Sequence, residues 1–385
     1  MTSDSDRRWM QYALKLARRG QGAVEPNPMV GCAIVVNDEL IGEGWHERFG
    51  GPHAEVNALA TCQKKDLTNA TLYVTLEPCA HHGKTPPCSQ TLIKSGIKRV
   101  VIAMQDPFPQ VDGRGIEQLR EAGIEVLTGV AEQQAQLLNA PFVMQQLHHR
   151  PWVIGKWAMT LDGKIATHTG SSQWISNEIS RAIVHQIRGR VDAIVVGHQT
   201  ALADNPSLNA RPAGPRTATR IVVARTPNLP LDSHLVSTAK QQPVIVTAGP
   251  EADPTHLENL RQHGVEILTF NNESEIVREL LRDLADRDFT NVLIEGGAEL
   301  LGACLDQNLI DEVHVFVAPK LVGAQTAPSP IGGTGIERMQ DALQLKNQTT
   351  QILDDDIYIS GIVSHNKSPN AVSYTHLTLP TILLV

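Results

Sequence analysis

The chain carries two motifs that decide the fold of its first part, His53-Ala54-Glu55 and Pro78-Cys79-Ala80-His81-His82-Gly83-Lys84-Thr85-Pro86-Pro87-Cys88. Zinc prefers four tetrahedral nitrogen and sulfur ligands, and a site with three protein ligands leaves the fourth position to water. His53, Cys79 and Cys88 would supply three such ligands. Glu55 is suited to accept the proton of that water and to return it. The motifs therefore predict a zinc centre for hydrolytic deamination, with Glu55 as its catalytic residue.

Eight residues separate the two cysteines, whereas nucleobase deaminases have a Cys-x-x-Cys motif. The intervening loop is polar, and its lysine and histidines could bind an anionic part of a substrate. The alternative is a surface turn flanked by two small buried cysteines. Zinc is favoured because the ligands stand beside predicted helix starts, where the helix dipole favours thiolate. The other cysteines lie in apolar runs and are interpreted as packing residues: Cys32, Cys62 and Cys304.

Length and charge limit the class of protein. A chain of 385 residues exceeds what one core usually supports, so we expect two domains. Five cysteines without paired spacing and an N-terminus without an apolar segment predict a cytoplasmic protein with no membrane association. The net charge of −8 disfavours a nucleic-acid partner. We expect a small-molecule substrate, and a homo-oligomer is compatible with the sequence.

The predicted domain boundary is a polar run that ends in Pro151. We predict a zinc-dependent pyrimidine deaminase domain over residues 1–147 and a second enzyme domain over residues 151–365. Residues 366–385 end in an apolar run without periodicity that is too short to span a bilayer. We expect these last residues to be a non-native tail.

Hydrophobic periodicity predicts alternating helices and strands in both domains, which is an α/β fold. In the first domain, helices are predicted at 6–19, after His53, at 89–95 and at 113–121, and strands at 29–36, 40–44, 71–76, 100–104 and 125–128. In the second, strands are predicted at 152–157, 192–196, 220–224, 244–247, 292–295 and 313–317, with helices at 177–188 and 274–284. Gly296-Gly297 follows a predicted strand and precedes a helix, so it is either a phosphate cradle or an ordinary helix start.

The first domain resembles the pyrimidine deaminase of riboflavin biosynthesis. The likeness rests on Asn27-Pro28-Met29-Val30-Gly31-Cys32, on His53-Ala54-Glu55 and on the run from Thr75 to Cys88. It implies a cytidine-deaminase-like zinc domain in which Asn27, His81 and Lys84 contact the pyrimidine and its ribose phosphate. Taken alone, Asn27 is better explained as a turn residue between prolines.

The second domain is similar to the NADPH-dependent reductase of the same pathway, which has a dihydrofolate-reductase-like fold. Short motifs carry this likeness. The first residues of four of them are Lys156-x-Ala158, Ser172-Gln173-Trp174-Ile175, Gly197-x-x-Thr200 and Glu295-Gly296-Gly297. The resemblance implies NADPH contacts from Ala158, Trp174, Thr200, Asp204 and Gly297. It implies substrate contacts from Ser172, Arg188, Leu208, Arg211 and Glu295.

The resemblance implies two reactions on one pathway compound. The first is zinc-dependent deamination of 2,5-diamino-6-ribosylamino-4(3H)-pyrimidinone 5′-phosphate, and the second is NADPH-dependent reduction of its ribosyl group to ribityl phosphate. Two alternatives stay open from the residues alone. One is a nucleobase or nucleoside deaminase with an unrelated second domain, and the other is a nucleotide-binding regulator in which zinc is a structural clip. Three ligands and Glu55 disfavour the clip.

Overall fold

The computed structural model describes residues 2–64, 66–80, 86–108, 112–272 and 275–365. It divides the chain into two compact units, Met1–His149 and Arg150–Val385. Two predicted substrate residues, His81 and Lys84, lie outside the described residues, and so does the predicted tail. Across the described ranges, no helix combines the length and the apolar character that a membrane crossing needs.

The first unit is a five-stranded sheet with helices on both faces, in the strand order β2-β1-β3-β4-β5. Its strands are β1 (Gly31–Val36), β2 (Glu39–Trp45), β3 (Thr71–Leu76), β4 (Arg99–Met104) and β5 (Glu125–Thr128). Its helices are α1 (Asp4–Ala17), α2 (Ala54–Ala60), α3 (Cys88–Ser95), α4 (Arg114–Glu121), α5 (Glu132–Leu138) and α6 (Ala140–His148).

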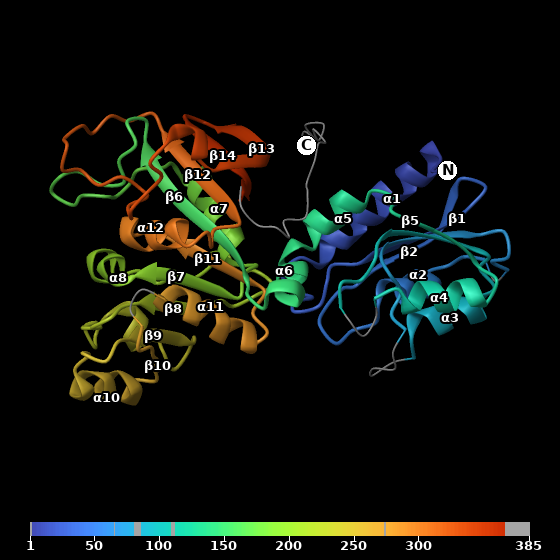
Figure 1. The fold of residues 1–385 in the computed structure, drawn as a ribbon, viewed down its shortest axis with the longest axis horizontal. Helices are drawn as coiled ribbons and strands as arrows, with labels where there is room; N and C mark the ends of the chain where they lie inside the picture. The colour runs from blue at the N-terminus through green and yellow to red at the C-terminus, as the bar shows by residue number, and fades with distance from the viewer. Residues whose placement is uncertain (1, 65, 81–85, 109–111, 273–274, 366–385) are drawn as a thin grey trace. The chain divides into compact units, whose positions relative to one another are not determined.

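Alternation along the strands produces two apolar layers in this unit. Cys32 and Ile34 of β1 pack with α2, α3 and α4, while Ala33 and Val35 pack with α1 and α5. Figure 1 shows these helices on opposite faces of the sheet. The β1–β2 turn falls at Asn37 and Asp38, which both have positive φ, as hairpin turns require. The predicted strands at 71–76 and 125–128 coincide with β3 and β5.

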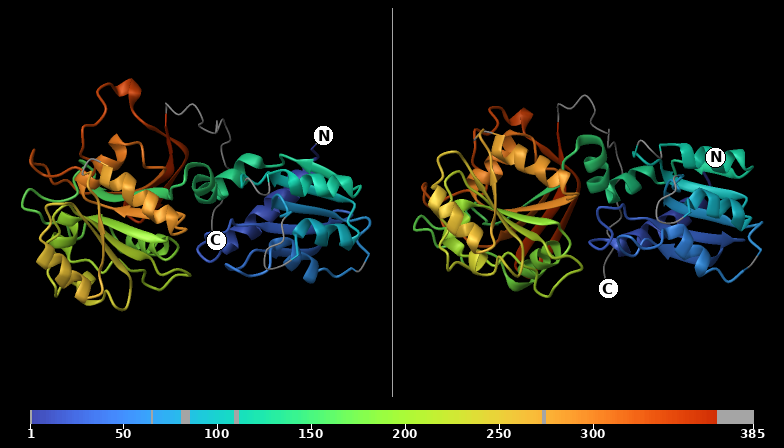
Figure 2. Two further views of the ribbon diagram at one scale, coloured as in Figure 1. Left: turned by 60° about the horizontal axis from the view of Figure 1, so that its bottom comes forward. Right: turned by 90° about the horizontal axis from the view of Figure 1, so that it is seen from below.

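The second unit contains a nine-stranded mixed sheet in the order β10-β9-β8-β7-β11-β6-β12-β14-β13, with helices on both of its faces (Figure 2). Its strands are β6 (Trp152–Thr160), β7 (Ala193–Gly197), β8 (Thr219–Val223), β9 (Val244–Ala248), β10 (Glu266–Thr269), β11 (Asn291–Glu295), β12 (Glu312–Ala318), β13 (Gln344–Leu353) and β14 (Asp356–Ser364). Its helices are α7 (Glu178–Arg188), α8 (His198–Asp204), α9 (His234–Ser237), α10 (Pro254–Gln262), α11 (Ile276–Asp286) and α12 (Ala298–Asp306).

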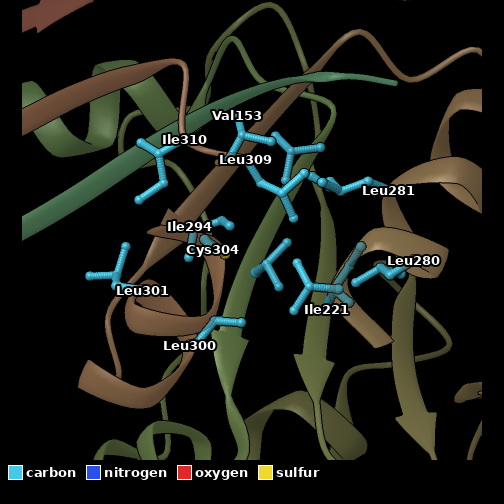
Figure 3. Packing of buried hydrophobic residues seen from close by; sticks show 14 of the residues in the cluster. Val153, Ile221, Leu280, Leu281, Ile294, Leu300, Leu301, Cys304, Leu309 and Ile310 are labelled. Atoms are coloured by element: carbon cyan, nitrogen blue, oxygen red, sulfur yellow. The ribbon is translucent and has the colours of Figure 1, made fainter. Parts of the chain in front are cut away.

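The main core of the second unit lies between the sheet and helices α11 and α12. Val153 and Ile221 contribute from the strands, and Leu280 and Leu301 from the helices (Figure 3). Cys304 is fully buried in this core, so its assignment to packing is confirmed. Cys32 is equally buried in the first unit, and Cys62 packs against the same cluster.

Candidate functional site

The three predicted zinc ligands converge although they come from three different elements. His53 is the residue that precedes α2, Cys79 follows β3, and Cys88 is the first residue of α3. His53 Nδ1 lies 3.6 Å from Cys79 Sγ and 3.2 Å from Cys88 Sγ, and all three donor atoms lie within 4.8 Å of one another. Tetrahedral zinc ligands stand about 3.5–3.8 Å apart. The His53–Cys79 distance lies in this range and the His53–Cys88 distance is slightly shorter, so the set is compatible with this metal.

The surroundings of Cys79 favour thiolate. The backbone N–H of Cys88, at the start of α3, donates to Cys79 Sγ over 3.3 Å. The hydrogen bond from the Cys88 side chain, together with that from His53, lowers the pKa of Cys79 to about 4 against the opposing effect of burial. A thiolate is the form that binds a metal ion. Cys79 therefore favours the metal-binding form, whereas its hydrogen bond with Cys88 and burial raise the pKa of Cys88.

Glu55 lies against the same cluster. It stands in the first turn of α2 and is 3% exposed, and its carboxyl group hydrogen-bonds with Cys88. Burial raises the pKa of Glu55 to about 7, and the nearby Cys79 adds to this effect, while His53 opposes it. A carboxyl group that titrates near neutrality can accept a proton and release it again.

Asn27 is joined to this site by a histidine that our sequence reasoning did not select. Asn27 Nδ2 lies 3.1 Å from Nε2 of His46, a residue that is 3% exposed. The Nδ1–H of His46 donates to the carbonyl oxygen of Pro52 over 3.0 Å, which leaves Nε2 to accept from the amide. The ring of His46 also meets that of His53, with 5.6 Å between their centroids. The sequence signal for His46 is weak, because it consists of the position directly after the partly buried strand β2.

In the second unit, two predicted substrate residues bind each other. Arg188, the last residue of α7, donates from Nε and Nη2 to Glu295 at the end of β11, over 2.5 Å and 2.9 Å. Lys156 of the neighbouring strand β6 lies 3.7 Å from the same carboxylate. Burial raises the pKa of Glu295, but the charges of Arg188 and Lys156 outweigh it and lower that pKa to about 2. Lys156 is part of the Lys156-x-Ala158 motif, and the sequence predicted no role for it.

Predicted cofactor residues gather where β7 and β11 end. Gly296 and Gly297 both have positive φ, so the turn before α12 requires residues without a side chain. A Cβ atom on Gly297 would lie 3.2 Å from Thr200 Oγ1 in α8. Asp204, at the end of α8, accepts a hydrogen bond of 3.4 Å from the Ser172 hydroxyl. The backbone of this glycine turn carries no side chain, so a ligand could approach it closely.

Trp174 is 64% exposed, and its loop is fixed from two sides. The guanidinium group of Arg181 lies over its ring, 4.7 Å from the centroid. Lys320 Nζ donates to the carbonyl oxygens of Trp174 and Ile175 over 2.6 Å and 2.8 Å. An exposed aromatic ring held in this way is a ready contact for a flat ligand.

The three remaining predicted residues of this unit lie in different environments. Ala158 is in β6 and packs beside Phe316 and Tyr358. Leu208 is 2% exposed and has a φ of 46°, so its contribution would come from the backbone or from the shape of the loop. Arg211 donates its backbone N–H to Nδ1 of His185 over 3.2 Å.

Known families match both units. The family model "Cytidine and deoxycytidylate deaminase zinc-binding region" matches residues 3–104, and the model "RibD C-terminal domain" matches residues 151–359. The riboflavin biosynthesis protein RibD of Actinobacillus pleuropneumoniae is 44% identical over 361 residues, which is 93% of this chain and 96% of that protein. RibD of Aquifex aeolicus is 38% identical over 93% of this chain and 99% of its own length. The chain belongs to the RibD family.

Solved RibD structures share the fold. Acinetobacter baumannii RibD (form 1) superposes with a TM-score of 0.82 at 38% identity, covering 94% of this chain and 99% of that one. A deaminase/reductase from Thermotoga maritima superposes with a TM-score of 0.80 at 36% identity and the same coverage. This RibD chain is therefore a bifunctional deaminase and reductase of riboflavin biosynthesis, as the sequence predicted, and its deaminase part contains a zinc-binding region.

Proposed function

We propose that residues 1–147 deaminate 2,5-diamino-6-ribosylamino-4(3H)-pyrimidinone 5′-phosphate and that residues 151–365 reduce the product with NADPH. The observation that carries the proposal is the buried Glu55 carboxyl group against the cluster of His53, Cys79 and Cys88. The Thermotoga maritima neighbour is named as a diaminohydroxyphosphoribosylaminopyrimidine deaminase and 5-amino-6-(5-phosphoribosylamino)uracil reductase. We place the reaction in the cytoplasm, since none of the five cysteines forms a disulfide.

In the deaminase site, zinc held by His53, Cys79 and Cys88 would act as a Lewis acid that makes a water molecule more acidic. Glu55 takes one proton from that water and passes it to a ring nitrogen as the water oxygen bonds to C2 of the pyrimidine. Glu55 then takes the second proton from the new C2 hydroxyl group and delivers it to the amino group. The C2–N bond breaks, ammonia leaves and a C2 carbonyl group forms, so the Glu55 carboxyl group returns to its starting state.

Substrate contacts in the deaminase site would come from Asn27, His81 and Lys84. The Nδ1–H bond of His46 to a carbonyl oxygen fixes that ring, and the ring fixes the Asn27 amide. An amide held in one orientation presents its oxygen to a donor of the pyrimidine. We assign the ribose phosphate to Lys84, because an ammonium group binds phosphate as a point charge.

In the reductase site, NADPH would supply the hydride that is added to ribose C1′. The bond from C1′ to the ring oxygen breaks, and a proton on the released oxygen completes the ribityl chain. We assign the cofactor to Ala158, Trp174, Thr200, Asp204 and Gly297, on the support of the Gly296-Gly297 turn, whose backbone lies beside Thr200. We assign the substrate to Ser172, Arg188, Leu208, Arg211 and Glu295, where arginine suits a phosphate through its planar donors.

Mass spectrometry of the purified protein tests both steps. With the diaminopyrimidinone phosphate alone, we expect a product heavier by about one mass unit, because an amino group is exchanged for oxygen. Adding NADPH should raise the mass by about two more units, because hydride and a proton are added. Ammonia release from cytidine or guanine, with no NADPH oxidation on the pyrimidine phosphate, would contradict the proposal.

A further inference from the structure

Glu77 stands two residues before the ligand Cys79 and is 3% exposed, yet neither proposed reaction uses it. Its carboxylate accepts hydrogen bonds from four backbone N–H groups. Oε2 accepts from Asp106 and Gly113 over 3.2 Å and 3.0 Å, and Oε1 from Gly115 and Ile116 over 2.9 Å and 3.3 Å. Both oxygens are therefore engaged with backbone, so Glu77 is not positioned as a fourth metal ligand.

Three of these donors belong to the start of α4. The first N–H groups of a helix have no partner within the helix, and Gly113, which precedes α4, has no side chain to cap them. Glu77 supplies the cap from a distant segment. Contact between the two segments is close, because a Cβ atom on Gly115 would lie 2.0 Å from the carbonyl oxygen of Pro78. The first turn of α4 is therefore in close contact with the peptide group that precedes Cys79.

A second link joins α4 to the same cysteine. The backbone N–H of Ser89 in α3 donates to the carbonyl oxygen of Cys79 over 3.2 Å. The Ser89 hydroxyl lies 3.1 Å from that oxygen and 2.6 Å from Oε1 of Gln118, which is in α4. Cys79 is therefore fixed from α4 on both sides, through Glu77 before it and through Ser89 after it.

We propose that Glu77 is a positioning residue for the metal centre, one that holds the Cys79 thiolate at its distance from His53 and Cys88. The inference rests on the proposal that these three residues bind zinc. Partners outside the ligand set typically change metal affinity by about 10–100-fold when they are removed. Glu77 acts through the backbone of its own segment, so it touches neither the metal nor the substrate.

The variant Glu77→Gln tests the assignment because it keeps the size of the side chain. Whichever way the new amide turns, its NH2 group faces two N–H donors, so one pair loses its acceptor. Glu117→Gln is the matched control, because Glu117 is exposed and in the first turn of the same helix. We expect competition with a chelator to show about 10–100-fold weaker zinc binding for Glu77→Gln alone. The thiolate-to-cobalt absorption of the cobalt-loaded protein should also shift.

Two further measurements separate positioning from general damage. NADPH-dependent reduction of the deaminated compound should stay at the parental rate, which shows that the second unit is unaffected. Excess zinc should restore deamination in Glu77→Gln, because the defect is in metal retention. If zinc affinity and the cobalt spectrum match those of the parent while only the unfolding temperature falls, Glu77 is a plain helix cap and the inference is wrong.

A folding failure would not end the test. If the deaminase part of Glu77→Gln does not fold, Glu77→Asp withdraws the carboxylate by one methylene and keeps its charge. The same zinc competition then applies, and parental affinity in that variant would overturn the inference. A parent protein that binds no zinc would instead refute the zinc site itself.

Discussion

The backbone N–H of Cys88 donates a hydrogen bond to the sulfur of Cys79 over 3.3 Å, so one predicted ligand stabilises the other. Cys88 can do this because it is the first residue of α3, where backbone N–H groups lack helical partners. The hydrogen bonds from the Cys88 side chain and from His53, together with this backbone contact, lower the pKa of Cys79 to about 4. Deamination and reduction are assigned to separate units of the chain, so each can be altered alone.

Glu55→Gln should abolish ammonia release and spare the reductase. The amide cannot carry a proton from water to the pyrimidine, and loss of a general base typically slows a reaction by about 10²–10⁴-fold. Single-turnover deamination and NADPH oxidation on the deaminated compound, measured on one preparation, check this. Equal loss of both activities would show that the two reactions do not have separate sites.

Cys88→Ser should remove the zinc and with it the deaminase activity. A serine hydroxyl is a far poorer ligand than a thiolate, and only two protein ligands would remain. Metal analysis by mass spectrometry should find zinc in the parent and almost none in the variant. Cys62→Ser is the control, because Cys62 packs against the core outside the ligand cluster and should keep its zinc. Zinc retained by Cys88→Ser would contradict the assigned ligand set.

Glu295→Gln should destabilise the second unit in a pH-dependent way. The pKa of Glu295 falls from 4.5 to about 2 on folding, so its carboxylate stabilises the fold above pH 4.5, and this contribution is lost as the pH falls toward 2. At neutral pH the variant leaves Arg188 and Lys156 buried without their partner, which costs about 3 kcal/mol. Urea unfolding at pH 7 and at about pH 3 should show this difference shrinking.

The control for that experiment is Glu299→Gln, since Glu299 is exposed on α12. It should unfold like the parent at both pH values. A loss of stability in Glu295→Gln that is the same at both pH values would show that packing, and not charge, accounts for the effect.

Lys320→Met should weaken the use of NADPH. The ammonium group holds the Trp174 loop through two carbonyl oxygens. Buried hydrogen bonds to charged groups contribute about 1.5–3 kcal/mol to stability, and the contribution is smaller at this exposed position. We expect KM for NADPH to rise by about five- to tenfold, with little change in deamination. Lys346→Met, on the exposed strand β13, should leave both unchanged. An unaltered KM for NADPH would show that the Trp174 loop does not contribute to cofactor binding.

Gly31→Ala should destabilise the first unit, because α1 crosses β1 at this residue. A Cβ atom there would lie 2.0 Å from the carbonyl oxygen of Ala13 and 2.6 Å from the N atom of Ala17. Both contacts are with backbone that cannot move alone, so we expect a loss of about 2–3 kcal/mol in urea unfolding. Gly197→Ala should cost little, since its nearest neighbour would be 3.7 Å away.

The sequence alone determined which residues form the metal cluster and most of the strands. The strand signal is local: β3 and β5 are short apolar or alternating runs ended by polar residues, so their bounds could be predicted. The ligand set was predictable because zinc selects imidazole and thiolate. The edge strand β13 was missed because its residues are mostly polar and exposed, and its hydrogen bonds go to β14. Strands β10 and β14 and helices α5, α6, α8, α9 and α10 were also missed.

Only the tertiary structure decided which polar groups meet. Arg188 pairs with Glu295 across 107 positions of sequence, His46 with Asn27 across 19, and Glu77 with the start of α4 across 36 to 39. No local pattern encodes these pairs. In the unfolded chain, water solvates each charged or polar side chain, so none of them needs a particular partner until folding buries it. Once it is buried, an unpaired polar group costs more than its hydrogen bond contributes, so the fold admits only arrangements that supply the partner.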